Sequence, residues 1–174
     1  MIDPAFGNWL AGFADGEGYF MVAGRPPSDL APRFGIGLRA DDRDILDEIR
    51  DRWGIGYINR RHYTDCGSRK QFNATGYKSR PQYTLRVSKK EALVVVVETF
   101  DRFPLRTKKA NDFVLWREAV ALYGEPPSPS RYTSLCDLQK RIRSGREYTE
   151  EKRDTRGEGV PYPNKILVRQ IPLF

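Results

Sequence analysis

Residues 10–18, Leu10-Ala11-Gly12-Phe13-Ala14-Asp15-Gly16-Glu17-Gly18, determine how the rest of the chain is interpreted. This apolar, helix-like run ends in two carboxylates separated by a glycine, and the strand-like residues 19–22 follow at once. Glycine inside a helix costs about 1 kcal/mol relative to alanine, so Gly12 indicates close approach by another backbone. The pairs Gly7/Ala11 and Gly12/Gly16 are each four residues apart and share helix faces. The pattern predicts a tightly packed helix that delivers an acidic group to a sharp turn.

Positive charge is concentrated in the middle of this chain. Its 174 residues include 30 Lys and Arg against 23 Asp and Glu, a net charge of +7. Residues 59–90 alone contain nine basic side chains and one acidic side chain. Such clustering favours a polyanionic partner, although a basic surface that is merely solvated is the alternative. With 39% hydrophobic residues, the chain is long enough for one globular domain with a real core.

Cysteine and histidine are too few and too scattered for a zinc site. Cys66, Cys136 and the single His62 lack zinc-ligand spacing, and this pattern favours a reducing, intracellular setting. The N-terminus lacks the basic and apolar regions of a secretory signal, and no apolar run reaches the roughly 18 residues of a membrane span. We therefore expect an intracellular protein of the cytoplasm, nucleoid or organelle matrix, neither secreted nor bound to a membrane.

Hydrophobic periodicity and turn signals predict an α+β chain. The expected elements are helix 3–14, strands 18–24 and 32–39, helix 42–53, strands 57–63 and 82–87, and helices 88–100, 107–123 and 135–143. Ser88 with Glu91 predicts a capping box, and Thr107 predicts another helix cap. The proline- and serine-rich residues 125–130 divide a core of residues 1–124 from residues 125–174, expected to be a linker, a short helix and a basic tail.

Four short motifs, in this order, resemble the LAGLIDADG homing endonucleases. The first is LAGFADGEG at residues 10–18, which occurs once; the others are FGIGLRADD at 34–42, WGIGYI at 53–58 and PLRTKK at 104–109. The resemblance covers roughly residues 5–123. It implies an αββαββα fold in which a four-stranded antiparallel saddle, backed by helices, lies on DNA. A single motif further implies a homodimer whose two motif helices pack side by side on a two-fold axis, with Gly7, Ala11, Gly12 and Asp15 at the interface.

The resemblance implies a metal-dependent endonuclease that cuts both DNA strands at a long pseudopalindromic site. Hydrolysis of a phosphodiester needs an activated water and stabilised phosphate charge, which Mg²⁺ supplies, with Mn²⁺ or Ca²⁺ as ions that could bind in its place. Glu17 matches the family's metal-binding acid, and the Gly16 carbonyl is the expected second ligand. Asp15 is instead expected to accept hydrogen bonds from backbone donors at the helix end.

A cation is expected on the turn before the late helix. In the family this turn sends a lysine toward the scissile phosphate, and alignment puts Arg106 there with Lys108 close behind. Either side chain could stabilise phosphate charge, but arginine cannot transfer a proton. The residues leave both assignments open.

Strand parity predicts which side chains face the DNA. Arginine, asparagine and glutamine can read base edges, whereas lysines mainly hold phosphates. The expected contacts are Arg25, Arg33, Arg39, Asn59, Arg61, Lys70, Lys78, Arg80, Gln82, Thr84 and Arg86.

Two other functions on the same fold stay open from the sequence. One is an RNA maturase that helps its host intron to splice, and the other is a catalytically inactive DNA-binding regulator. The acid at position 17 and the basic turn favour an active nuclease, encoded within an intron, over the regulator.

Overall fold

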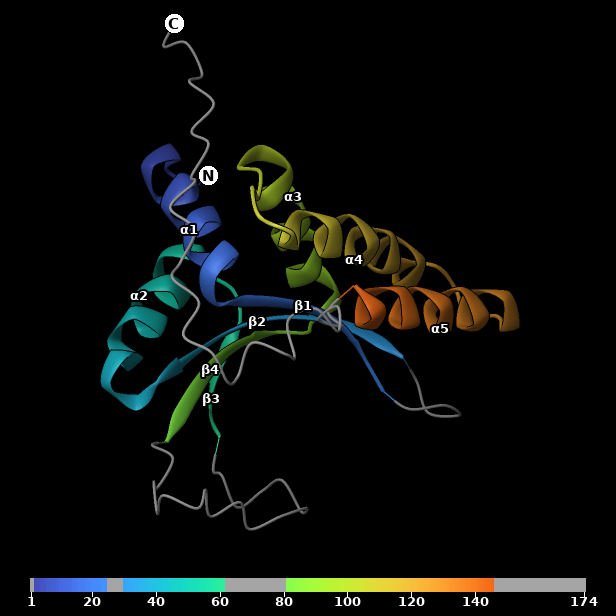
Figure 1. Cartoon of the computed structure of the whole chain (residues 1–174), viewed down its shortest axis with the longest axis horizontal. Coiled ribbons are helices and arrows are strands. Elements are labelled where there is room, and N and C mark those ends of the chain that lie inside the picture. The colour runs from blue at the N-terminus through green and yellow to red at the C-terminus, as the bar shows by residue number, and fades with distance from the viewer. Residues whose placement is uncertain (1, 25–29, 62–80, 146–174) are drawn as a thin grey trace, which may run out of the picture.

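A computed structural model describes residues 2–24, 30–61 and 81–145, with the backbone alone described at Arg61. Four antiparallel strands form one sheet in the order β1-β2-β4-β3. The strands are β1 (Gly18–Ala23), β2 (Ala31–Arg39), β3 (Tyr57–Arg61) and β4 (Gln82–Val87). Helices cover one face of this sheet, and the other face is open (Figure 1). The α+β fold predicted from the sequence, with its antiparallel saddle, is confirmed.

The helices are α1 (Pro4–Glu17), α2 (Arg43–Trp53), α3 (Lys90–Arg102), α4 (Lys109–Gly124) and α5 (Pro129–Ser144), with a short 3₁₀ turn η1 (Ala40–Asp42) before α2. Asp3 caps α1 by accepting a hydrogen bond from the Phe6 amide at 2.9 Å. The predicted capping box at α3 is wrong, because the helix begins at Lys90 and no side chain caps it. At α4 the cap position falls on Lys108, one residue after the predicted Thr107, but the Thr107 hydroxyl accepts a hydrogen bond from the Lys109 amide at 3.3 Å.

An aromatic cluster fills the space between the sheet and the helices. Phe20 of β1 is fully buried, and its ring lies 5.0–5.8 Å from the rings of Phe34, Phe100, Phe113 and Trp116. These rings come from two strands and two helices, so one cluster joins both layers of the fold. The alternating positions of β2 and β4 that were expected to be apolar are the ones that enter this core.

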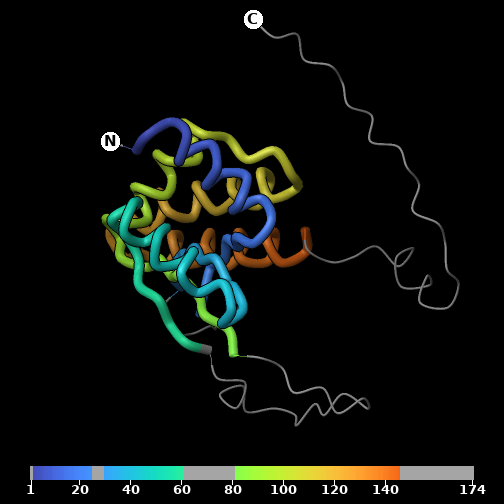
Figure 2. The backbone as a smooth tube through the Cα atoms, turned by 90° about the vertical axis from the view of Figure 1, so that its left-hand side faces the viewer, coloured from blue at the N-terminus to red at the C-terminus, as the bar shows by residue number. Residues whose placement is uncertain are grey.

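Helix α5 is longer than predicted and packs on the core. Ser128 caps it, accepting from the Arg131 amide at 3.1 Å, so the helix starts six residues before the expected Leu135. Leu135, Leu138 and Ile142 are buried with the main core. Gln139 donates its amide to the carbonyl of Val22 at 2.7 Å and to that of Gly24 at 3.2 Å. Both views show α5 running beside α4 (Figure 1 and Figure 2). A boundary at residue 124 stays a prediction, but α5 shares the core of the residues before it.

None of the helices in the described residues is both long and apolar enough to cross a membrane.

Candidate functional site

The end of α1 passes directly into β1 at the two acidic residues of the motif. Glu17 is the last residue of the helix, and its side chain is exposed. Gly18 starts the strand, and its amide donates to the Ala14 carbonyl. A Cβ at Gly18 would lie 2.6 Å from that carbonyl oxygen, so only glycine permits this abrupt turn. Glu17 is thereby fixed at the corner between the helical layer and the sheet.

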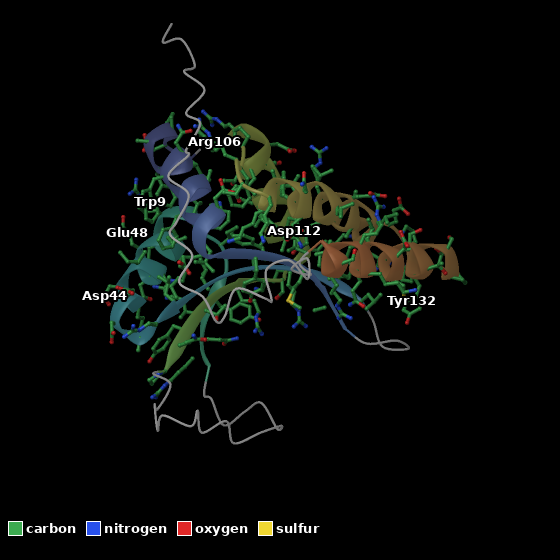
Figure 3. The ribbon with its side chains drawn as sticks, viewed as in Figure 1. Trp9, Asp44, Glu48, Arg106, Asp112 and Tyr132 are labelled. Carbon is green, nitrogen blue, oxygen red and sulfur yellow. The ribbon has the colours of Figure 1, made fainter. Side chains whose placement is uncertain are left out.

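Asp15 ties this corner to the turn before α4. Its carboxylate accepts hydrogen bonds from the Arg106 amide at 2.7 Å, the Thr107 amide at 3.2 Å and the Thr107 hydroxyl at 2.8 Å. The residues are more than 90 positions apart in the chain. The turn lies beside α1, with Arg106 labelled in Figure 3. Asp15 therefore satisfies backbone donors within its own chain, as expected for a structural acid.

Lys109 is the cation that reaches the corner. Its ammonium donates to the Gly16 carbonyl at 2.6 Å and to the Ala14 carbonyl at 3.3 Å. Arg106 and Lys108 were the cations predicted from the sequence. Their side chains are exposed, and the Arg106 contact to Asp15 is made by its backbone. Three basic residues lie within four positions here, and Lys109, the first residue of α4, is the one whose side chain points back to α1.

We expect removal of the Asp15 carboxylate to detach this turn. Asp15→Ala loses three hydrogen bonds to a charged acceptor and should lower the free energy of unfolding by about 2–3 kcal/mol. Urea denaturation measures the loss. Glu118→Ala, an exposed acid on α4, is the control and should change stability by less than about 0.5 kcal/mol. If the two variants were equally stable, the hydrogen bonds between the Asp15 carboxylate and the turn at Arg106 and Thr107 would not stabilise the fold.

The oxygen donors at the corner suit a hard divalent cation in type. The Glu17 carboxylate and the Gly16 carbonyl are oxygen ligands of the kind that Mg²⁺ prefers. The Lys109 ammonium holds the Gly16 carbonyl in this structure, so a bound ion would have to share or displace that contact. Within the described residues, no three His, Cys, Asp or Glu side chains gather into a potential metal-binding group. The described part of one chain thus supplies too few protein ligands for a closed cage. The residues fit an open site completed by a second copy, water or nucleic-acid oxygens.

The outer face of α1 is aromatic and has open space beside its glycines. Trp9 is 42% exposed and projects into solvent (Figure 3), and its ring stacks between those of Phe6 and Phe13. A Cβ on Gly12 or Gly16 would meet nothing within 4 Å. This face is free to receive another backbone.

Two of the predicted interface residues lie on the opposite side of α1. A Cβ on Gly7 would overlap the ring of Phe103, and Ala11 is buried in the core. Their small size therefore serves packing within the chain. Asp15 is engaged by hydrogen bonds within its own chain. Of the four predicted interface residues, Gly12 is therefore the one that lies on the exposed face of α1.

The register of the sheet brings most predicted nucleic-acid contacts onto its open face. Arg86 lies opposite Gly35 and Tyr57, Thr84 opposite Gly37 and Asn59, and Gln82 opposite Arg39 and Arg61. Arg33 pairs with Met21 at the other end of β2. Arg39 is bound to Asp41 at 2.9 Å. Four predicted contacts lie outside the described residues: Arg25, Lys70, Lys78 and Arg80.

Arg86 has three neighbours on the sheet that were not predicted from the sequence to matter for function: Tyr19, Gly35 and Tyr57. Burial alone would lower the pKa of Arg86, but the hydroxyls of Tyr19 and Tyr57 raise it overall. The pKa of Tyr57 is lowered, mainly by a hydrogen bond with Ser88 and then by Arg86, against the opposing effect of burial. Tyr19 reaches Arg86 across Gly35, which parity alone could have indicated.

A family model described as LAGLIDADG endonuclease matches residues 10–120. A curated relative from Podospora anserina, called an uncharacterized 50.9 kDa protein in ND4 intron 1, is 32% identical over 130 residues, which are 70% of this chain and 24% of that protein. The chain spans about a quarter of the length of the curated relatives that it matches.

Two solved structures are similar in fold. The homing endonuclease I-TnaI has 25% identity and a TM-score of 0.62, and the match covers 83% of this chain and 97% of that one. I-SmaMI, bound to an uncleaved DNA target in the presence of calcium ions, has 22% identity and a TM-score of 0.65, and the match covers 83% of this chain and 46% of that one.

Proposed function

The chain belongs to the LAGLIDADG endonuclease family, and from this premise we propose that it cuts double-stranded DNA at a specific site as a homodimer. The observation that carries the proposal is the corner between α1 and β1, where Glu17, the Gly16 carbonyl and Lys109 lie together. A carboxylate and an ammonium at one end of a basic saddle suit phosphodiester hydrolysis on a polyanion. The name of the relative from Podospora supports an origin within an intron and an intracellular setting, including an organelle matrix.

We propose that Glu17 and the Gly16 carbonyl hold a divalent cation, Mg²⁺ in the cell. Such an ion, when bound, supplies charge stabilisation at the phosphate and a more acidic water. Mn²⁺ or Ca²⁺ could bind the same oxygens. The calcium ions in the I-SmaMI structure support oxygen-rich coordination in a related fold. The protein's own part is to place the carboxylate, hold the turn through Asp15 and position the ammonium.

Lys109 is the proposed cationic residue, in place of Arg106 and Lys108. Lys109→Met should lower the cleavage rate by about 10²-fold, because a preorganised charge near the phosphate is lost. The rate of single-turnover cleavage measures the effect. Arg106→Met and Lys108→Met are the controls from the same turn and should lower the rate less. A larger loss in either control would restore the assignment made from the sequence.

The homodimer is proposed from the single motif and the free face of α1. The match spans nearly the whole of I-TnaI but about half of I-SmaMI, which is consistent with one structural unit that needs a second copy. In a two-fold dimer, the glycines at 12 and 16 would let two copies of α1 approach closely, and Trp9 would be covered.

Gly12→Arg is expected to separate the subunits without unfolding them. A Cβ at this exposed position meets no described atom within 4 Å, and arginine favours a helix more than glycine by about 0.5–1 kcal/mol. Light scattering after size exclusion should therefore show a folded monomer. Val114→Arg, at an exposed position of α4, is the control and should remain dimeric. A wild-type chain that is monomeric even on DNA would refute the homodimer.

One assay tests the main proposal. The protein is incubated with Mg²⁺ and a library of randomised duplex DNA, and the cut ends are captured and sequenced. A recurrent, pseudopalindromic site cut on both strands supports the endonuclease. Binding without cutting would instead favour the regulator, and promotion of splicing of the host intron would favour the maturase.

A further inference from the structure

A row of four side-chain positions crosses the open face of the sheet beside the catalytic corner. Tyr19 lies opposite Gly35, Gly35 opposite Arg86, and Arg86 opposite Tyr57. The row therefore takes one position from each strand. Tyr19 is two residues from Glu17, so the row lies next to the proposed site of cleavage.

Gly35 makes the row possible. A Cβ built on this residue would lie 2.5 Å from both Cζ and Oη of Tyr19, so the ring could not keep this position beside any larger residue. The Tyr19 ring thus lies across the strand β2 and brings its hydroxyl to Arg86. Gly37, two residues along the same face, carries no such ring, since a Cβ there would meet only Thr84 Oγ1 at 3.7 Å.

Arg86 is consequently held from both sides. Its half-buried guanidinium interacts with the hydroxyls of Tyr19 and Tyr57, from the two edge strands of the sheet. Two tyrosine oxygens leave other guanidinium N–H groups available for a ligand, because arginine has five donors in a fixed fork. Holding this long side chain in place lowers the conformational entropy lost when it binds.

We infer that Tyr19, Gly35 and Tyr57 are positioning residues that hold Arg86 ready to read one guanine near the cleavage site. A fixed planar fork on a sheet that lies against DNA suits the O6 and N7 acceptors of guanine, which arginine binds with two hydrogen bonds. The inference rests on the proposed DNA function and deepens it, by naming the residues that set the specificity at one base pair.

The test measures base preference by binding, so it does not depend on cleavage. Wild type, Arg86→Lys, Tyr19→Phe and Gly35→Ala are each used to select sites from the randomised duplex library, and the bound DNA is sequenced. Arg86→Lys should lose about 10-fold or more of the preference for guanine at one base pair, because lysine cannot form the two-pronged contact. Tyr19→Phe and Gly35→Ala should weaken the preference at the same base pair.

Matched controls separate positioning from folding. Gly37→Ala adds the same methyl group to the same face, and Tyr123→Phe removes the same hydroxyl from α4; both should keep the wild-type preference. Circular dichroism checks that all variants fold. The salt dependence of binding to one fixed duplex of about 30 base pairs is measured as well. If Arg86→Lys changes this salt dependence but keeps the base preference, Arg86 holds a phosphate and the inference is overturned. Unchanged preference in all three test variants would overturn it also, whereas a wild type that binds no DNA would refute the proposed function itself.

Discussion

Replacing Glu17 by glutamine is expected to lower DNA cleavage by about 10³-fold or more while leaving the fold intact. A metal ligand that is lost removes several kcal/mol of stabilisation from the transition state. Glu17 is exposed at the end of α1, so the amide fits without repacking. Single-turnover cleavage of the selected site in Mg²⁺ measures the change.

The control for Glu17 is the same substitution at a nearby acid with another task. Asp15→Asn keeps the shape of the side chain but loses its negative charge, so it should lower the free energy of unfolding. At saturating Mg²⁺ it should lower the cleavage rate much less than Glu17→Gln does. Glu17→Gln should bind DNA with nearly the wild-type affinity. Undiminished cleavage by Glu17→Gln would refute the proposed role of this carboxylate.

Phe20→Ala is expected to produce the largest loss of stability, about 3–5 kcal/mol. The ring is fully buried and contacts aromatic rings from β2, α3 and α4, so its removal leaves a cavity where the two layers meet. Urea denaturation should show a lower midpoint with an unchanged slope. Since Phe20 is three residues from Glu17, the cavity should also loosen the corner.

Exposed apolar residues provide the comparison for Phe20. Val94→Ala and Val114→Ala remove apolar side chains that are 46% and 54% exposed, and each should cost less than about 0.5 kcal/mol. If Phe20→Ala lowered the free energy of unfolding by no more than these two variants do, the aromatic cluster would not be the centre of the core.

The sheet was predictable because its two faces differ strongly in polarity. In β2, Phe34 and Ile36 alternate with Arg33 and Gly35, and a shift of one residue would bury arginine. The register therefore follows from the sequence pattern. The abrupt turn at Gly18 was also within reach, because two glycines flank Glu17.

The parts that could not be predicted depend on contacts between distant segments. Lys109 was not named from the sequence because its contacts are to the carbonyls of Ala14 and Gly16, more than 90 positions away, and the local pattern does not contain them. Gly7 and Gly12 look alike in sequence, and only the ring of Phe103 shows that Gly7 packs inside the chain. Helix α5 was predicted to start too late because the proline- and serine-rich residues 125–130 resemble a linker, whereas Ser128 caps the helix and Pro129 is its first residue.

The side-chain amide of Gln139 helps to protect an edge of the sheet against aggregation. A strand at the border of a sheet presents unpaired carbonyl and amide groups, which can pair with another molecule and start aggregation. Gln139 occupies the carbonyls of Val22 and Gly24 on the border strand β1, so α5 shields this end of the strand. We expect a chain that lacks α5 to expose this end of the border strand and to aggregate more readily than the whole chain.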